Sequence, residues 1–331
     1  MTLKLPSSSK EMQNWEWSDY VPYFENLLNQ DIDKTNINTW MKYWSDFSEL
    51  IGEVGTEVYV ATTVDTTDED AKKRFNAFLE NVSENASSKN QILRKKLLES
   101  GAIPDNFEIP LRSIKSEVEL FRENNLPLMT KDSKLSKEYD AIIGAQTIEW
   151  EGKEITITQL GPVLLETNRE RREKAWRLAA ERRLKDRNKI NEVWKKTLKT
   201  RINIAENADK DNYRSWRWEY LSRFDYTPED CLNFHSAIEK VVMPFVNKLI
   251  KKRKEQLGLE ILKPWDLSVD PLNRNPLKPF EDADELEEKC HNIFSAVDKE
   301  LGNHFKIMRE EKLLDLANRK GKAPGGYCTE Y

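Results

Sequence analysis

The longest periodic stretch of the sequence, from Asn168 to about Ala208, predicts a helix that dominates the fold. Apolar residues recur mostly at every fourth position along it, which is typical of one buried helix face. A chain with so long a helix is expected to build its core mainly by packing helices. The predicted buried stripe consists of Trp176, Ala180, Leu184, Ile190, Trp194, Leu198 and Ile202.

Composition supports a mainly α fold class. The 331 residues include only 11 Gly and 13 Pro, which is sparse for a β-sandwich or for an α/β protein with many tight turns. Ten Trp, ten Tyr and twelve Phe supply a large core and exclude a disordered chain. The net charge of −5 gives no global attraction to nucleic acid or to an anionic membrane.

Further helices are expected before and after this stretch, and one short segment differs. Residues 148–158 alternate apolar and polar side chains about Glu151-Gly152, which predicts a β-hairpin lying on the helical body. We predict that the hairpin marks the boundary between two domains, residues 1–145 and 146–331. The other predicted helices span residues 19–29 with Ser18 as cap, 36–64 with the buried stripe Trp40, Tyr43, Trp44, Phe47, Leu50, Ile51 and Val54, 68–99 headed by Thr67 and stopped by Gly101, 111–124, 228–257 and 283–309.

The histidines and cysteines predict no metal site. Cys231 and His235 are four residues apart on a predicted helix, but two ligands do not make a zinc centre. His291 and His304 are not part of a His-Glu-x-x-His motif. The three scattered cysteines, with no apolar leader at the N-terminus and no long apolar run, favour a soluble protein of the reducing cytoplasm.

Two other features have a structural and a functional interpretation. Residues Arg169–Arg201 contain 14 Lys and Arg against 5 Asp and Glu, so this helix face has the charge for binding phosphates. We favour a solvated face whose cations pair with nearby carboxylates. The aromatic residues of Tyr213–Tyr226 are expected to pack between helices rather than to stack on a ligand.

The end of the sequence is broken by Pro324-Gly325-Gly326 and then becomes strand-like at Tyr327–Tyr331. The segment Asp315–Tyr327 resembles the region just before the metal site in the thimet oligopeptidase/oligoendopeptidase F family of zinc metallopeptidases. Three earlier blocks resemble the same family in the same order, so the resemblance covers Tyr213–Tyr327. These blocks are Arg223–His235, Lys263–Asp266 and Pro276–Phe280.

This resemblance implies specific roles. Gly325, Gly326 and Tyr327 would form a substrate-binding edge strand, because glycines leave the backbone accessible to an added peptide strand. The N-terminal helices would form one wall of a channel for short peptides. The family's His-Glu-x-x-His zinc ligands are expected beyond Tyr331, so this chain is predicted to hold no catalytic and no metal-binding residue.

We therefore predict the N-terminal portion of a zinc-dependent oligopeptidase that hydrolyses short peptides, truncated within its catalytic domain and inactive without that half. Its partners would be peptide substrates and the missing C-terminal half, with no nucleic acid and no membrane. An alternative is a non-catalytic helical binding or scaffold protein. A second rival is a nucleic-acid binder that uses the Arg169–Arg201 face.

Overall fold

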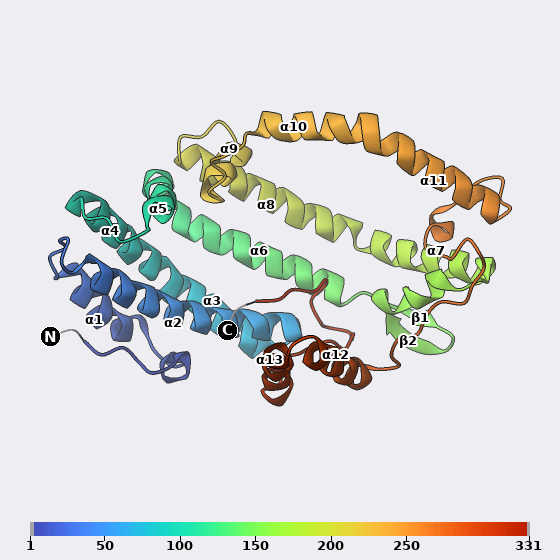
Figure 1. Ribbon diagram of the computed structural model, residues 1–331, viewed down its shortest axis with the longest axis horizontal. Helices are drawn as coiled ribbons and strands as arrows, with labels where there is room; N and C mark the ends of the chain where they lie inside the picture. The colour runs from blue at the N-terminus through green and yellow to red at the C-terminus, as the bar shows by residue number, and fades with distance from the viewer. Residues whose placement is uncertain (1–2, 330–331) are drawn as a thin grey trace. The chain divides into compact units, whose positions relative to one another are not determined.

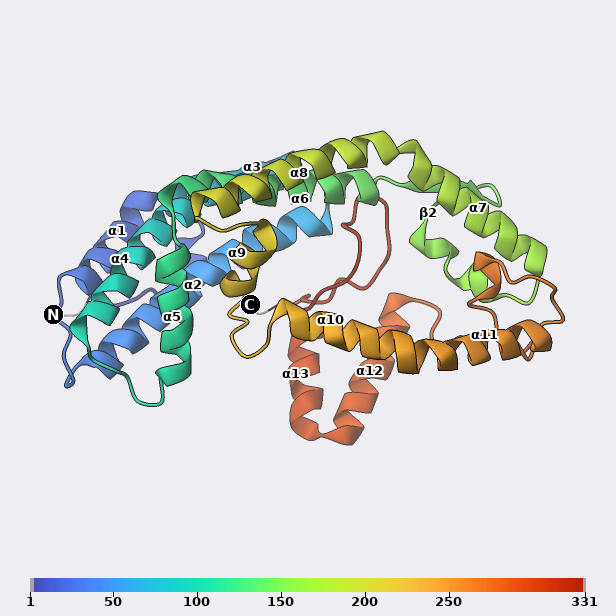
Figure 2. The same cartoon turned by 90° about the horizontal axis from the view of Figure 1, so that it is seen from above.

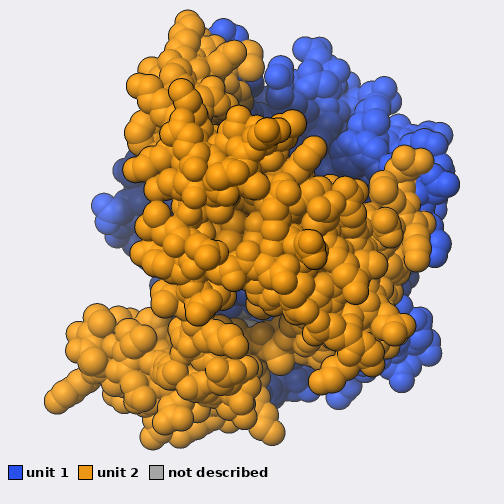
Figure 3. All heavy atoms as spheres, turned by 90° about the vertical axis from the view of Figure 1, so that its right-hand side faces the viewer, with its two compact units in different colours: residues 1–143, 188–230, 323–331 blue, residues 144–187, 231–322 orange. Residues whose placement is uncertain are grey.

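The computed structural model describes residues 3–329, and helices make up most of it (Figure 1). The predicted mainly α fold class with one small hairpin is confirmed. The chain divides into two compact units, coloured separately in Figure 3. The first comprises residues 1–143, 188–230 and 323–331, and the second residues 144–187 and 231–322. The two-domain division after residue 145 stays a prediction.

The first unit is an assembly of helices. Its elements follow in chain order, and Figure 1 labels the α-helices among them. They are α1 (Trp17–Leu28), α2 (Ile37–Val64), α3 (Glu69–Ala77), the π-helical turn η2 (Phe78–Ser83), α4 (Glu84–Ser100), α5 (Glu108–Leu120), α6 (Leu126–Gly144, whose last residue falls in the second unit), α8 (Arg187–Asn207, whose first residue does so) and α9 (Tyr213–Tyr220).

The aromatic core of this unit lies between α1 and α2. The predicted stripe of α2 is confirmed: Trp40 and Phe47 are buried, and the Trp40 indole donates to the Leu27 carbonyl over 3.1 Å. Helix α1 begins two residues before the predicted start. Glu16 caps it, not Ser18, and the Glu16 backbone N–H donates to the Asp19 carboxylate.

The helix predicted for residues 68–99 is present as α3, η2 and α4, which follow one another without a break. Asp68 rather than Thr67 is its N-cap, since its side chain accepts from the N–H groups of Asp70 and Ala71. Gly101 ends it as predicted, with a φ of 64° that glycine adopts without strain.

Helix α6 was not expected from the sequence. The Asn-Asn-Leu-Pro run before it is typical of a helix end, but here Leu126 and Pro127 form the first turn of a new helix. Proline lacks an N–H, and the first turn of a helix does not need that donor.

The long helix predicted for 168–208 is two helices, α7 (Arg169–Lys185) and α8, with Asp186 between them. The prediction of its buried stripe is wrong for four of the seven residues, while Trp176, Ala180 and Ile190 are half-buried. Trp194 is 57% exposed, and Leu184, Leu198 and Ile202 are exposed as well. The buried face of α8 lies elsewhere on the helix, where Ile204 and its neighbours pack with Leu128 and Met129 of α6; its buried members are Val193, Thr197, Thr200, Ile204 and Ala205.

The second unit contains the hairpin and the remaining helices. Strands β1 (Thr147–Trp150) and β2 (Lys153–Thr156) form the predicted hairpin and pair antiparallel, with Ile148 opposite Ile155. Glu151 and Gly152 form the turn with φ of 53° and 80°. The helices are α7, α10 (Pro228–Ala237, which starts in the first unit), the π-helical turn η6 (Ile238–Val242), α11 (Met243–Gln256), α12 (Ala283–Val297) and α13 (Lys299–Glu310).

Helices α12 and α13 lie side by side, as Figure 2 shows. They replace the single helix predicted for residues 283–309. The break is at Asp298, whose side chain accepts from the N–H groups of Glu300 and Leu301 and so starts α13. Gly302 permits the close approach, since a Cβ there would lie 2.8 Å from the Cα of Ser295.

No helix of the described chain combines the length and the apolar character required to span a lipid bilayer. The cysteines Cys231, Cys290 and Cys328 form no disulfide.

Candidate substrate-binding segment

The segment after α13 is an irregular loop that is held together by hydrogen bonds and ion pairs among its own residues. The Lys322 ammonium donates to the carbonyl oxygens of Asp315 and Ala317 over 2.5 and 3.1 Å. Arg319 donates to the Asp315 carboxylate over 2.6 Å. These cations, Arg319 foremost, hold the pKa of Asp315 below its usual range. The loop therefore keeps its shape without regular secondary structure.

The hairpin supports the next part of this segment within the second unit. The Thr156 hydroxyl donates to the Asn318 side chain over 2.6 Å, and Gly321 N–H donates to the Gly144 carbonyl over 2.9 Å. Lys320 lies 2.8 Å from Glu154 and lowers the pKa of that carboxyl. The hairpin thus serves as a support for the segment, a role that its sequence pattern does not reveal.

Gly325 and Gly326 leave their backbone accessible. Gly325 has a φ of 86°, a conformation that favours glycine. Gly326 has open space where a side chain would start. Both are exposed, and in the part of the chain that the structure describes neither backbone forms a hydrogen bond. Such groups can accept and donate to an added peptide.

The predicted edge strand of residues 325–327 is not formed, and the strand-like residues 327–329 form no strand either, while residues 330 and 331 lie outside the described residues. A strand is defined by hydrogen bonds to a partner, and no strand of residues 3–329 pairs with this segment. Tyr327 is instead anchored by its side chain, which contacts Thr63 and Tyr59 of α2. Neither α2 residue is predictable from the sequence, because no local pattern links positions so far apart.

The structure places the candidate metal ligands as follows. Cys231 is half-buried and His235 is exposed on α10, while His291 lies on α12 and His304 on α13. Within residues 3–329 no three His, Cys, Asp or Glu side chains gather in a way that could hold a metal ion. These residues by themselves therefore do not fit a zinc centre.

The basic residues of α7 are extensively paired. Arg169 and Arg172 both donate to Asp266, which is wholly buried, and Arg171 pairs with Glu166 and Glu151. On α8, Arg201 pairs with Asp132 over 2.9 Å. Each of these carboxylates offsets a cation that the phosphate-binding hypothesis would use, which supports the structural interpretation of this charge.

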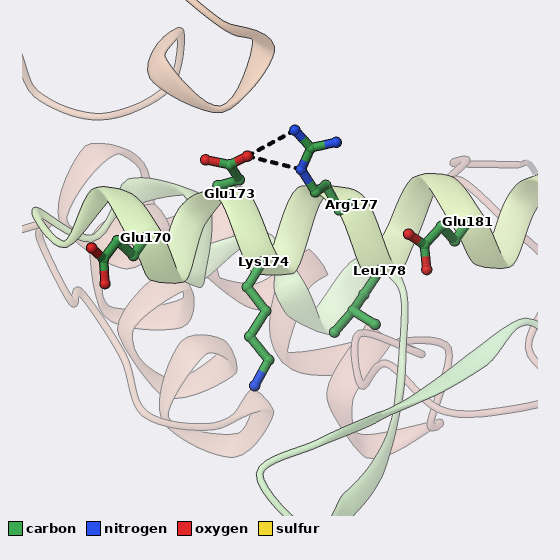
Figure 4. Close-up of a pocket in the computed structure, with 6 residues that line it drawn as sticks. All are labelled: Glu170, Glu173, Lys174, Arg177, Leu178 and Glu181. Carbon is green, nitrogen blue, oxygen red and sulfur yellow. Dashed lines mark hydrogen bonds and ion pairs between the residues drawn. The ribbon is translucent and has the colours of Figure 1, made fainter.

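A shallow hollow lies on the exposed side of α7, and its lining does not point to a particular ligand. Figure 4 shows Glu173 and Arg177 joined across one helical turn, while Lys174 and Leu178 point away from that pair. Its charged groups belong to a single helix, and the Glu173–Arg177 pair is an ordinary surface interaction of spacing four. We assign it no ligand.

The sequence that contains the terminal segment matches a known protein family. The model of peptidase family M3 matches residues 163–331, which is more than half of the chain. The chain belongs to peptidase family M3. The match includes the hairpin-supported loop and the Gly325–Tyr327 segment of this M3 chain. Among curated proteins, its sequence finds no match.

Solved structures show the same fold. A protein assigned as oligoendopeptidase F from Bacillus anthracis str. Ames superposes with a TM-score of 0.80 at 22% identity, over 98% of the M3 chain and 59% of its own. PZ peptidase A with an inhibitor gives 0.85 at 24%, over 99% and 58%. Oligoendopeptidase-F from Enterococcus faecium gives 0.63 at 15%, over 94% and 68%. The M3 chain thus spans less than three fifths of the length of the first two.

Proposed function

We propose that this chain is the N-terminal, peptide-binding part of a zinc-dependent oligopeptidase of the cytoplasm. The observation that carries the proposal is the M3 match over residues 163–331, which contains the exposed Gly325–Gly326 backbone. The substrates would be short peptides in extended conformation. Such a peptide would add as a strand to residues 325–327, with backbone hydrogen bonds giving affinity that is largely independent of sequence.

In this proposal, zinc would be held by residues beyond Tyr331, and the described residues would contribute binding and orientation only. The helices of the first unit would form one wall of a channel. Three unpaired cysteines support a location in a reducing compartment.

The proposal also requires a surface for the part of the peptidase that carries the metal. Helices α10, α11 and α12 contain no buried residue. Phe234, Phe245 and Ile293 are among their large exposed apolar side chains. The related structures are longer than this chain. We therefore propose that a counterpart of their remaining part would pack against these exposed helices.

The test of peptide binding uses a dye-labelled pentapeptide and fluorescence anisotropy with the chain of residues 1–331. Gly326→Pro removes one backbone donor and should weaken binding about fivefold, the value of one net hydrogen bond. Gly326→Ala keeps the N–H, and its Cβ meets open space, so it should bind like the unsubstituted chain. Absence of peptide binding by the unsubstituted chain would refute the proposal.

The exposed apolar helices also fit a non-catalytic helical binding protein. Limited proteolysis distinguishes this alternative from the proposed part of a peptidase. A peptidase part that lacks its counterpart should be cut within α10–α13 well before the aromatic core of α1 and α2. A protease-resistant monomer that ignores peptides would favour the binding protein.

A further inference from the structure

Tyr327 is held by one face of α2. Its hydroxyl lies 2.5 Å from the Thr63 hydroxyl, and its ring centroid lies 5.9 Å from that of Tyr59. Tyr59 and Thr63 are four residues apart, so they share a helix face. The Thr63 hydroxyl already donates to the Val60 carbonyl over 2.8 Å. Because a hydroxyl has one proton, Tyr327 is the donor and Thr63 the acceptor between them.

Thr63 makes a second contact on the other side of the glycines. Its backbone carbonyl accepts from the Ala323 N–H over 2.9 Å. Ala323 and Tyr327 flank Pro324-Gly325-Gly326, so both ends of this short arch are attached to one residue of α2. Thr63 itself is buried, which fixes its position.

Tyr59 is braced in turn by α6 and α3. The Lys137 ammonium lies 3.7 Å from the centre of the Tyr59 ring and 3.3 Å from the Asp140 carboxylate. The Phe75 ring meets Tyr59 edge-on at 6.1 Å. Burial raises the pKa of Tyr59, and burial lowers that of Lys137 despite Asp140. The ring that Tyr327 meets is therefore fixed from two neighbouring helices.

We infer that Thr63 is a positioning residue for peptide binding, which attaches both ends of the Pro324–Gly326 arch to α2 so that the Gly325 and Gly326 backbone is preorganised. This inference rests on the proposed function. Glycines lose more conformational freedom on ordering than any other residue, so an unattached Gly-Gly segment would bind a peptide at a large entropic cost. Attachment before binding removes part of that cost.

The test places a nitroxide spin label on Cys328, which is exposed and adjacent to Tyr327. The other two cysteines are replaced by Cys231→Ser and Cys290→Ser. In this background of residues 1–331, the label should report restricted motion. Thr63→Val and Tyr327→Phe each remove the hydroxyl contact, so each should mobilise the label and weaken binding of the labelled pentapeptide about fivefold.

Two variants control for structural damage. Thr63→Ser keeps the hydroxyl and should restore both readouts. Thr62→Val removes the neighbouring hydroxyl, which donates to the Tyr59 carbonyl over 2.6 Å, and should change neither readout. Thermal unfolding followed by circular dichroism verifies that each variant is folded.

The outcomes separate this inference from the proposed function. A mobilised label in Thr63→Val with unchanged peptide affinity would overturn the positioning role, and an unchanged label would overturn the attachment itself. If the unsubstituted chain binds no peptide while Thr63→Val still mobilises the label, the proposed function fails and the attachment of Tyr327 to α2 stands.

Discussion

Arg172 donates from Nη2 to Oδ1 of Asp266 over 3.1 Å, and Arg172 is only 2% and Asp266 0% exposed. Arg169 donates to the same carboxylate over 2.8 Å, and Arg172 Nε donates to the Trp265 carbonyl. The pair fixes the turn Pro264–Asp266 against α7 in the second unit. Since both charges are removed from water, each depends on the other for compensation.

Asp266→Asn should lower the free energy of unfolding by about 3–5 kcal/mol, because it leaves the Arg172 guanidinium buried without its counter-ion. Urea denaturation measures this. Asp270→Asn is the matched control, since Asp270 pairs with a largely exposed Arg274 and should cost much less stability than Asp266→Asn. Equal losses in the two variants would contradict a special role for the buried pair.

Stability should depend on pH through the same carboxyl. Burial raises the pKa of Asp266, but hydrogen bonds from Arg169, the Lys263 N–H and Arg172 outweigh it and hold the pKa below the usual value. A lowered pKa in the folded state contributes stability above the unfolded-state value of about 3.9. This contribution should decline as the pH falls below about 4 towards the folded-state pKa. Urea denaturation between pH 3 and 6, at about half-unit steps, should show a smaller decline in Asp266→Asn.

Gly302→Ala should destabilise the α12–α13 pair by about 1–3 kcal/mol, since the added Cβ would lie 2.3 Å from the Ser295 hydroxyl. Gly52→Ala in α2 meets open space and should be neutral or stabilising by up to about 1 kcal/mol. Thermal unfolding compares the two. An unchanged stability of the Gly302→Ala variant would contradict this, because it would mean that α12 and α13 can move apart without a loss of free energy.

Trp194→Gln should change the free energy of unfolding by less than about 0.5 kcal/mol, because the indole is exposed on α8. Trp216→Ala should cost about 3–5 kcal/mol, because Trp216 is buried and stacks with Tyr213 and Tyr220. Chemical denaturation followed by circular dichroism measures both. A large loss of unfolding free energy in Trp194→Gln would instead support the buried stripe predicted from the sequence.

The chain of residues 1–331 alone should cleave no quenched fluorescent peptide, with or without added zinc. The physical reason is that the proposed zinc ligands lie outside it, so no metal-bound water is activated. Chelator-sensitive cleavage by the purified chain would contradict this expectation and the division of roles behind it.

The features predicted correctly from the sequence are those with local causes. The α2 stripe about Trp40, the hairpin turn at Glu151-Gly152 and the helix end at Gly101 each follow from spacing or from a residue's backbone preference. The exposed α8 stripe was mispredicted because periodicity shows that a helix has an apolar face but not which face meets a neighbour. Contacts with α6 decide which face of α8 is buried. Helix α6 itself was not predicted, because Pro127 in its first turn is also typical of a helix end.

The candidate site was predictable only in part. Gly325, Gly326 and Tyr327 came from the family resemblance, whereas their anchors Thr63 and Tyr59 carry no signal in a single sequence. An anchor of this kind depends on tertiary proximity alone.

The Thr63–Tyr327 contact joins residues 264 positions apart. Closing so long a loop before its ends are ordered is entropically unfavourable, so the arch should dock late, onto an α2 that has already folded with its aromatic core. The same separation has an evolutionary consequence. In an alignment of M3 sequences, positions 63 and 327 should vary together, with a loss of the hydroxyl at one accompanied by its loss at the other.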